Sequence, residues 1–236
     1  MPRVLVGELM DDPALDPSAH AHALRGLARI NAMSGIVRQL YPILKKAAER
    51  RGRPLTITDI ATGSADLPVA LLRRAQRDGI KLEITACDIS PVALGHASER
   101  AKTAGVELRT AELDVLADDP PRADVVMCAL FLHHLEDAQV GQVLSRMIRA
   151  SESSVLVSDL RRGWRGTTRA ASIPRLATRS PVVHTDALLS ARAALSIAEL
   201  REMMREVAGG GDWHVAPAFP ARMLLTWQRT SSSTPS

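Results

Sequence analysis

Two patterns of hydrophobic residues divide the chain near residue 55. Before this point, apolar residues recur three or four positions apart, at Leu24, Leu27, Ala28, Ile30, Ile36, Val37, Leu40, Ile43 and Leu44. This spacing predicts a first helix after Pro17 and a second helix capped by Ser34. We expect the second helix to end before Gly52 and Pro54.

After residue 55, short apolar runs typical of strands alternate with helical patterns. The expected strands are 56–60, 82–87, 106–110, 125–129 and 154–158, and the expected helices are 67–77, 91–104 and 138–150. This alternation predicts a doubly wound α/β fold with a mostly parallel sheet. A helix at 196–207 precedes two β-like segments, 213–216 and 222–228, which can pair as an antiparallel hairpin at the sheet edge.

These elements suggest three regions. We expect an N-terminal helical cover at 1–54, an α/β domain at 55–229 and a disordered tail at 230–236. Hydrophobic residues make up 46% of the 236 residues, which is ample for a packed core. The longest apolar run, 125–132, is far shorter than the ~20 residues of a membrane-spanning helix. The acidic N-terminus does not resemble a signal peptide, so we expect a cytoplasmic protein without a membrane partner.

The charge, aromatic content and cysteine content argue against several kinds of binding partner and site. The net charge is +4, and aromatic residues are only 3%, which argues against a stacking surface for single-stranded nucleic acid. Cys87 and Cys128 both lie in apolar segments, so neither a disulfide scaffold nor a cysteine-rich metal site is expected.

The segment 59–68 carries the clearest chemical signal. It follows a strand and opens a helix, with Gly63 at the turn, Asp66 as the expected N-cap and Pro68 in the first turn. A dinucleotide-binding loop needs the pattern Gly-x-Gly-x-x-Gly, of which only Gly63 is present. Asp66 would also repel a phosphate at the helix N-terminus. A cationic ligand without phosphate, such as S-adenosylmethionine, fits this loop better.

The loop and three later segments resemble the class I S-adenosylmethionine-dependent methyltransferases. The family's first motif is an acid followed by x-x-x-Gly-x-Gly; Asp59 and Gly63 match it, whereas Ala65 replaces the second glycine. The later matches are Cys87-Asp88-Ile89-Ser90, Leu113-Asp114-Val115 and a segment after the fourth strand that ends in His133-His134-Leu135. The resemblance covers about residues 55–160 and implies a Rossmann-like fold.

This resemblance implies where S-adenosyl-L-methionine binds. Asp88 would accept both ribose hydroxyls, and Asp114 would face the adenine amino group. A dehydrogenase would share Asp88, so only the loop distinguishes the two families. The implied cofactor-binding residues are Asp59, Ala61, Thr62, Gly63, Ser64, Asp66, Asp88, Ile89, Asp114, Val115 and Ala129.

Three histidines are candidate bases for an acceptor that keeps its proton. His133 and His134 follow the fourth strand, and His184 lies in the region expected to vary with substrate. Arg161 and Arg162 follow the fifth strand and could hold an anionic substrate, or they could lie on a solvated helix face. In the N-terminal cover, Arg25, Arg29, Asn31 and Tyr41 are candidate acceptor contacts.

The sequence thus favours O-methylation of a phenolic or polyketide-like small molecule of secondary metabolism. Carbon methylation, as in quinone biosynthesis, is the alternative within the same class. An RNA methyltransferase is suggested by the isoelectric point of about 9.6 but not by the small net charge. A cofactor-binding protein without catalysis is a third class. We expect a monomer or a homodimer.

Overall fold

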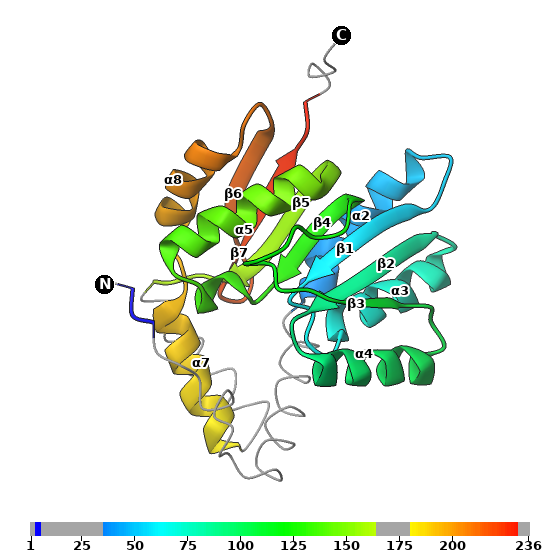
Figure 1. The fold of residues 1–236 in the computed structure, drawn as a ribbon, viewed down its shortest axis with the longest axis horizontal. Helices are drawn as coiled ribbons and strands as arrows, with labels where there is room; N and C mark the ends of the chain where they lie inside the picture. Colours follow the sequence, from blue (N-terminus) through cyan, green and yellow to red (C-terminus); the bar gives the residue numbers. More distant parts are fainter. Residues whose placement is uncertain (1–2, 6–34, 164–179, 231–236) are drawn as a thin grey trace.

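The computed structural model describes residues 3–5, 35–163 and 180–230, which form a seven-stranded sheet between helices (Figure 1). The strand order is β3-β2-β1-β4-β5-β7-β6. The strands are β1 (Leu55–Ile60), β2 (Leu82–Asp88), β3 (Arg109–Glu112), β4 (Ala123–Ala129), β5 (Ser151–Leu160), β6 (Asp212–Ala218) and β7 (Arg222–Gln228).

The sheet has one parallel part and one antiparallel part. Strands β1 to β5 pair in parallel, whereas β7 pairs antiparallel with both β5 and β6. The chain moves outward from β1 through β2 to β3 and then returns to β4 on the other side of β1. The β1–β4 boundary is therefore the topological switch point, beside which ligands bind at the carboxyl ends of the strands. We call this side of the sheet the carboxyl edge.

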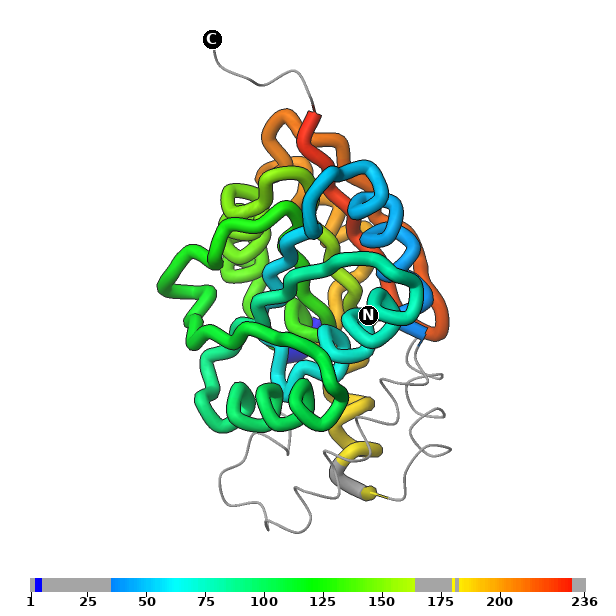
Figure 2. The backbone as a smooth tube through the Cα atoms, turned by 90° about the vertical axis from the view of Figure 1, so that its right-hand side faces the viewer, coloured from blue at the N-terminus to red at the C-terminus, as the bar shows by residue number. Residues whose placement is uncertain are grey.

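Helices cover both faces of the sheet (Figure 1). Apolar residues of α2 (Ile36–Glu49) and α3 (Asp66–Asp78) pack with Ile57, Met127 and Leu156, and α4 (Pro91–Ala104) packs beside α3. We call this the α2 face. The opposite face packs against α5 (Asp137–Ala150) and α8 (Ile197–Val207) through Val126, Val157 and their neighbours. A 3-10 turn, η2 (Leu132–His134), follows β4, and α7 (Pro181–Ala193) extends beyond the carboxyl edge (Figures 1 and 2).

The predicted fold is confirmed, including the hairpin at the sheet edge. The largest shifts are at the start of β3, which begins at Arg109 instead of residue 106, and at the start of β5, which begins at Ser151 instead of residue 154. Gly105 ends α4 in a left-handed conformation, and the Val106 N–H donates to the Ala101 carbonyl, so this amide caps the helix instead of joining the sheet. The helix α7 was not predicted as an element. The first expected N-terminal helix lies outside the described residues.

A buried carboxylate joins the N-terminal part to the sheet at the amino edge. Asp124 accepts hydrogen bonds from Arg51, from both terminal nitrogens of Arg53 (2.8 and 2.7 Å) and from the Thr56 N–H (3.0 Å). Burial alone would raise the pKa of Asp124, but these partners outweigh it and hold the pKa below its usual value. The boundary at residue 54 stays a prediction, since α2 packs directly on the sheet core.

Candidate functional site

The loop after β1 contains three left-handed residues at alternate positions. Ala61, Gly63 and Ala65 have φ values of 50°, 55° and 56°. Only one of these positions is glycine, although this conformation costs other residues ~1–2 kcal/mol. With Leu130, directly after β4, the two alanines are the non-glycine residues of positive φ in the described chain. All three lie at the carboxyl edge, which indicates backbone strain at a functional site.

Asp59 is a buried carboxylate at the base of this loop. Its Oδ2 atom accepts a hydrogen bond from the Thr62 hydroxyl at 2.7 Å, whereas its buried Oδ1 atom has no partner within the described residues. Burial raises the pKa of Asp59 from 3.8 to about 7, and the negative charge of Asp88 contributes to this rise. A cationic ligand would satisfy the Oδ1 atom and favour the ionised form.

Asp88 connects the ends of β1 and β2. Its Oδ2 atom accepts the Gly63 N–H at 2.7 Å, and its Oδ1 atom accepts the Ser90 N–H at 3.0 Å. Each oxygen keeps a further lone pair that can accept a ligand hydroxyl. The adjacent Ile89 is 63% exposed, which leaves an apolar surface beside the carboxylate.

The remaining expected cofactor residues lie nearby along the same edge. Asp114 accepts the Leu116 N–H at 2.8 Å and is half-buried, while Val115 is buried. The Leu113 N–H donates to the Asp88 carbonyl, so the segments after β2 and β3 are joined. Ala129 ends β4 beside the switch point.

Asp66 differs from its expected role as a helix cap. The N-cap of α3 is Ala65, and Asp66 is the first helical residue. Its carboxylate pairs with Arg100 at 2.7 Å, and the Arg100 Nε donates to the Ser64 carbonyl at 2.9 Å. Arg100 therefore fixes the loop to α4, a contact between distant segments that local sequence spacing could not reveal.

His133 forms a buried pair with Asp159, the ninth residue of β5. The His133 Nδ1 atom lies 2.6 Å from Asp159 Oδ1, and the His133 backbone N–H donates to Oδ2 at 3.2 Å. Burial would raise the pKa of Asp159, but His133 and the Leu160 N–H outweigh it and lower the pKa. The ionised Asp159 therefore orients the imidazole and favours the tautomer that is basic at Nε2.

Arg3 holds the turn that carries His133. Its guanidinium donates to the carbonyls of Leu132 (3.2 Å), Leu135 (2.6 Å) and Ala193 (2.6 Å) and pairs with Asp137. This contact joins η2 to the end of α7 and the start of α5. Sequence reasoning missed it, since nothing local links Arg3 to segments so distant along the chain.

The other two histidines are not placed equally. His134 is exposed, and its ring stacks against His133 with centroids 4.2 Å apart. His184 lies in the first turn of α7, nine residues before Ala193 and thus about 13 Å from it along the helix axis. Because Ala193 is the end near η2, the structure does not bring His184 together with His133.

The expected acceptor contacts are only partly supported. Arg161 is half-buried at the carboxyl edge, but Arg162 pairs with Glu199 and donates to the Ala194 carbonyl at 3.0 Å, so it joins α7 to α8 instead. Tyr41 is a correction, because its hydroxyl donates to Asp78 at the far end of α3, near the amino edge. Arg25, Arg29 and Asn31 lie outside the described residues.

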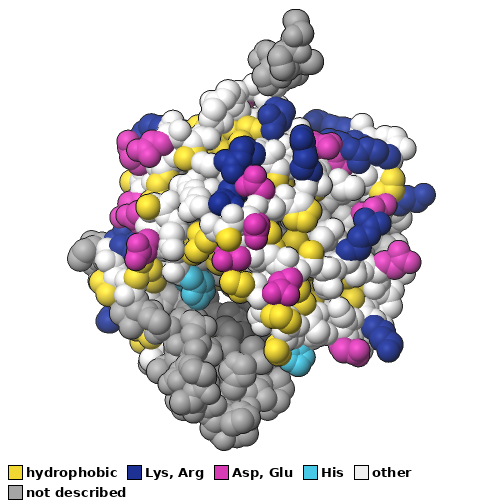
Figure 3. All heavy atoms as spheres, viewed as in Figure 1, with side chains coloured by type: hydrophobic (Ala, Val, Ile, Leu, Met, Phe, Trp, Pro, Cys, Tyr) yellow, Lys and Arg dark blue, Asp and Glu magenta, His cyan; other side chains and the backbone are white. Residues whose placement is uncertain are grey.

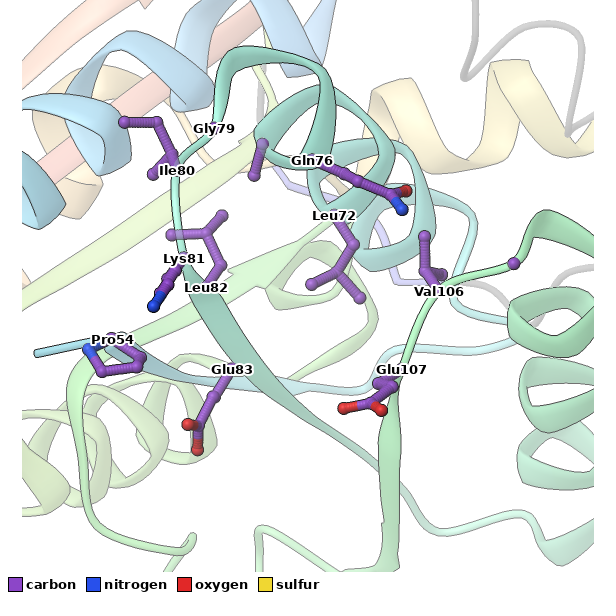
Figure 4. Close-up of a pocket in the computed structure, with 12 residues that line it drawn as sticks. Pro54, Leu72, Gln76, Gly79, Ile80, Lys81, Leu82, Glu83, Val106 and Glu107 are labelled. Carbon is purple, nitrogen blue, oxygen red and sulfur yellow. The ribbon is translucent and has the colours of Figure 1, made fainter.

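A groove at the opposite end of the sheet takes no part in this site. It lies between the end of α3 and the starts of β2 and β3 and is lined by residues including Leu72, Gln76, Glu83 and Glu107 (Figure 4). Because parallel sheets bind ligands at the carboxyl ends of their strands, we place the site at the other edge.

Comparison with known proteins agrees with this geometry. Residues 57–153 match a family described as "Methyltransferase domain". Over these residues the chain carries a class I S-adenosylmethionine-dependent methyltransferase domain. The matched residues include the left-handed loop, Asp88 and both histidines of η2, whereas Asp159 lies just beyond them. No curated protein sequence matches the chain.

Solved structures share the fold of this methyltransferase across nearly the whole chain. The magnesium protoporphyrin IX methyltransferase from Synechocystis PCC 6803 is 15% identical, with a TM-score of 0.60 over 94% of this chain and 91% of that chain. It was solved with S-adenosylhomocysteine and also with S-adenosylmethionine. An O-methyltransferase family 2 protein from Planctomyces limnophilus, solved with apigenin, is 18% identical, with a TM-score of 0.62 over 93% of this chain and 63% of that chain. These similarities establish the fold, and the cofactor of the domain is S-adenosylmethionine.

Proposed function

We propose that this methyltransferase acts on a hydroxyl group of a small phenolic or polyketide-like molecule. The observation that carries the proposal is the buried pair of His133 and Asp159 directly after β4. A phenol keeps its proton at neutral pH, so a base that removes it assists methyl transfer. The similar structures include O-methyltransferases, one of them solved with apigenin, which supports this acceptor class.

Residues of this chain would hold the cofactor along the carboxyl edge. The unpartnered Oδ1 of Asp59 fits its cationic amino acid part, and the remaining lone pairs of Asp88 fit the ribose hydroxyls. Ile89 offers an apolar surface to the adenine, and Asp114 fits its amino group. When bound, S-adenosylmethionine supplies an activated methyl group. Ala61, Thr62, Gly63, Ser64, Val115 and Ala129 complete the proposed set.

In the proposed mechanism, the protein orients the acceptor and moves one proton. Asp159 fixes His133 Nδ1 as the protonated nitrogen, so Nε2 takes the acceptor proton, and the negative charge of Asp159 stabilises the resulting imidazolium. This buried carboxylate is the reason to prefer His133 as the base, and His134 and His184 remain secondary candidates.

Two variants test the base. We expect His133→Gln and Asp159→Asn to lower kcat about 10²-fold or more while S-adenosylhomocysteine affinity stays unchanged. Apigenin serves as the first acceptor, with mass spectrometry and NMR to locate the methyl group. His96→Gln, an exposed histidine on α4, is the matched control. Full activity in His133→Gln would remove the base from the mechanism.

The product also separates the alternatives. A methyl group on carbon would favour the C-methyltransferase alternative. Methylated RNA would favour the nucleic-acid alternative, although basic and acidic side chains are interspersed on the described part of the face in Figure 3. Binding of S-adenosylhomocysteine without any methylated product would favour a cofactor-binding protein without catalysis.

A further inference from the structure

Four buried side-chain atoms in the described chain have no hydrogen-bond partner. They are Gln39 Oε1, Asp59 Oδ1, Ser158 Oγ and Arg222 Nη1. Buried polar groups without a partner are rare because each costs free energy. All four lie toward the carboxyl edge of the sheet, where β1 and β5 end, β7 begins and α2 starts. Their location at the same edge indicates that a bound ligand supplies the missing hydrogen-bond partners.

Alternation along the strands places three of these side chains on the α2 face. Met223 and Leu225 pack in the α5-side core, so Arg222 points with Leu224 toward α2. Leu156 and Ile57 also pack on the α2 face, and residues two positions apart on a strand share a face. Ser158 and Asp59 therefore lie on the α2 face as well. Ser158 pairs with Leu224 and Leu160 with Arg222, so Ser158 and Arg222 are diagonal neighbours.

Arg222 is buried more deeply than is usual for a charged residue. It is only 3% exposed, and its Nη1 atom has no hydrogen-bond partner within the described structure. Burial lowers the pKa of Arg222 to about 10, so the guanidinium is charged at neutral pH, and Asp159 attracts it only from the opposite face of the sheet. The Asp159 oxygens already accept bonds from His133 and Leu160.

We propose that Arg222 and Ser158 bind a carboxylate group of the methyl acceptor. This inference rests on the proposed function and names its substrate class. A planar guanidinium holds a carboxylate through two parallel hydrogen bonds, and a nearby hydroxyl adds a third donor. One guanidinium balances the single negative charge of a carboxylate, whereas a phosphate group carries between one and two negative charges at neutral pH.

The cofactor's own carboxylate is a second source of the same chemistry. Arg222 lies three strand positions from Asp59 in the order β1-β4-β5-β7, which corresponds to about 14 Å across the sheet. The cofactor's carboxylate and ammonium share one carbon atom, so a cofactor held at Asp59 leaves its carboxylate far from Arg222. The geometry therefore favours the acceptor.

Binding of a matched pair of probes tests this proposal. Calorimetry measures the affinity for 4-hydroxybenzoate, which has a carboxylate, and for its neutral analogue 4-hydroxybenzamide. Both are titrated with and without S-adenosylhomocysteine. We expect wild type to bind the carboxylate about 10-fold more tightly or better, and Arg222→Met to lose this preference. Arg77→Met replaces an exposed arginine in the last turn of α3, far from the carboxyl edge; it is the control and should keep this preference.

Several outcomes would overturn the carboxylate site. One is a wild type that does not prefer the carboxylate, and another is a preference that survives Arg222→Met. A preference that is lost equally in the control Arg77→Met, or is lost in Arg161→Met but kept in Arg222→Met, would also overturn it. A 10-fold loss of S-adenosylhomocysteine affinity in Arg222→Met would assign Arg222 to the cofactor instead. If Arg222→Met does not fold, Arg222→Lys keeps the charge but not the paired geometry and should show a reduced preference. Failure of wild type to bind S-adenosylhomocysteine would contradict the proposed function, independently of the probe preference.

Discussion

The ionisation of Asp59 should make both stability and cofactor affinity depend on pH. Burial raises its pKa to about 7 in the folded protein, against 3.8 for an ordinary carboxyl. Between these values the folded state holds a proton that the unfolded state has lost, so the stabilising contribution of Asp59 is present at low pH and is lost as the pH rises to about 7. Each pH unit in this window changes the free energy of unfolding by about 1.4 kcal/mol.

The substitution Asp59→Asn removes this titration. From pH 5 to pH 7, wild type should lose about 2–3 kcal/mol of stability relative to the variant. Urea denaturation at several pH values measures the difference. Asp118→Asn replaces an exposed carboxyl and should leave the pH dependence unchanged. Parallel pH profiles for wild type and Asp59→Asn would refute the reasoning.

Cofactor binding should show the reciprocal effect. If the ionised Asp59 faces the ammonium group, raising the pH from about 6 to about 7.5 increases the ionised fraction, and the affinity for S-adenosylhomocysteine, roughly 8-fold. Calorimetry across this range should show the increase in wild type, whereas Asp59→Asn should bind weakly with little pH dependence. An unchanged affinity in the variant would remove Asp59 from the cofactor site.

Three further predictions concern the structure around the site. Asp124→Ala should destabilise the protein by about 1–3 kcal/mol in urea denaturation because it removes the buried acceptor of Arg51, Arg53 and the Thr56 N–H; a loss as small as that of the exposed Asp119→Ala would contradict this. Ala61→Gly should raise the thermal midpoint, since relief of ~1–2 kcal/mol of left-handed strain exceeds the ~0.5–1 kcal/mol entropic cost of glycine; a lower midpoint would argue against strain. Arg3→Ala should accelerate hydrogen exchange at residues 132–135, and unchanged protection would show that Arg3 does not hold this turn.

The sequence predicted most of the fold because most elements have a regular hydrophobic pattern. The residues of α4 and β7 were predicted with their observed bounds, and the hairpin was placed at the correct edge. The helix α7 was not predicted, because its buried side includes Asp186 and Ser190 between small apolar residues. These polar positions interrupt the stripe that identifies an amphipathic helix.

From the sequence, only those site residues could be predicted that belong to a local motif. Gly63 and Asp88 were found from their spacing after strands, and they lie together in the structure, joined by a hydrogen bond of 2.7 Å. The motif placed Ala65 at the position of its second glycine, whereas Ala61, the other left-handed alanine, matches no glycine of the motif. Arg222 could not be found in this way, since an arginine at the start of a strand is usually exposed and only the register with β5 places it inside.

In the described chain, the buried charged groups that keep unpartnered atoms lie at one edge of the sheet. At the amino edge, Asp124 is fully satisfied by two arginines and a backbone N–H, as expected of a carboxylate that serves stability. At the carboxyl edge, Asp59 and Arg222 keep atoms without partners among the described residues, and the left-handed alanines add strain. Because the chain supplies every hydrogen-bond partner that Asp124 needs at the amino edge, a lack of suitable residues does not explain the unpartnered atoms at the carboxyl edge. The unsatisfied groups at the carboxyl edge are therefore best explained by ligands that complete them, a cation at Asp59 and an anion at Arg222.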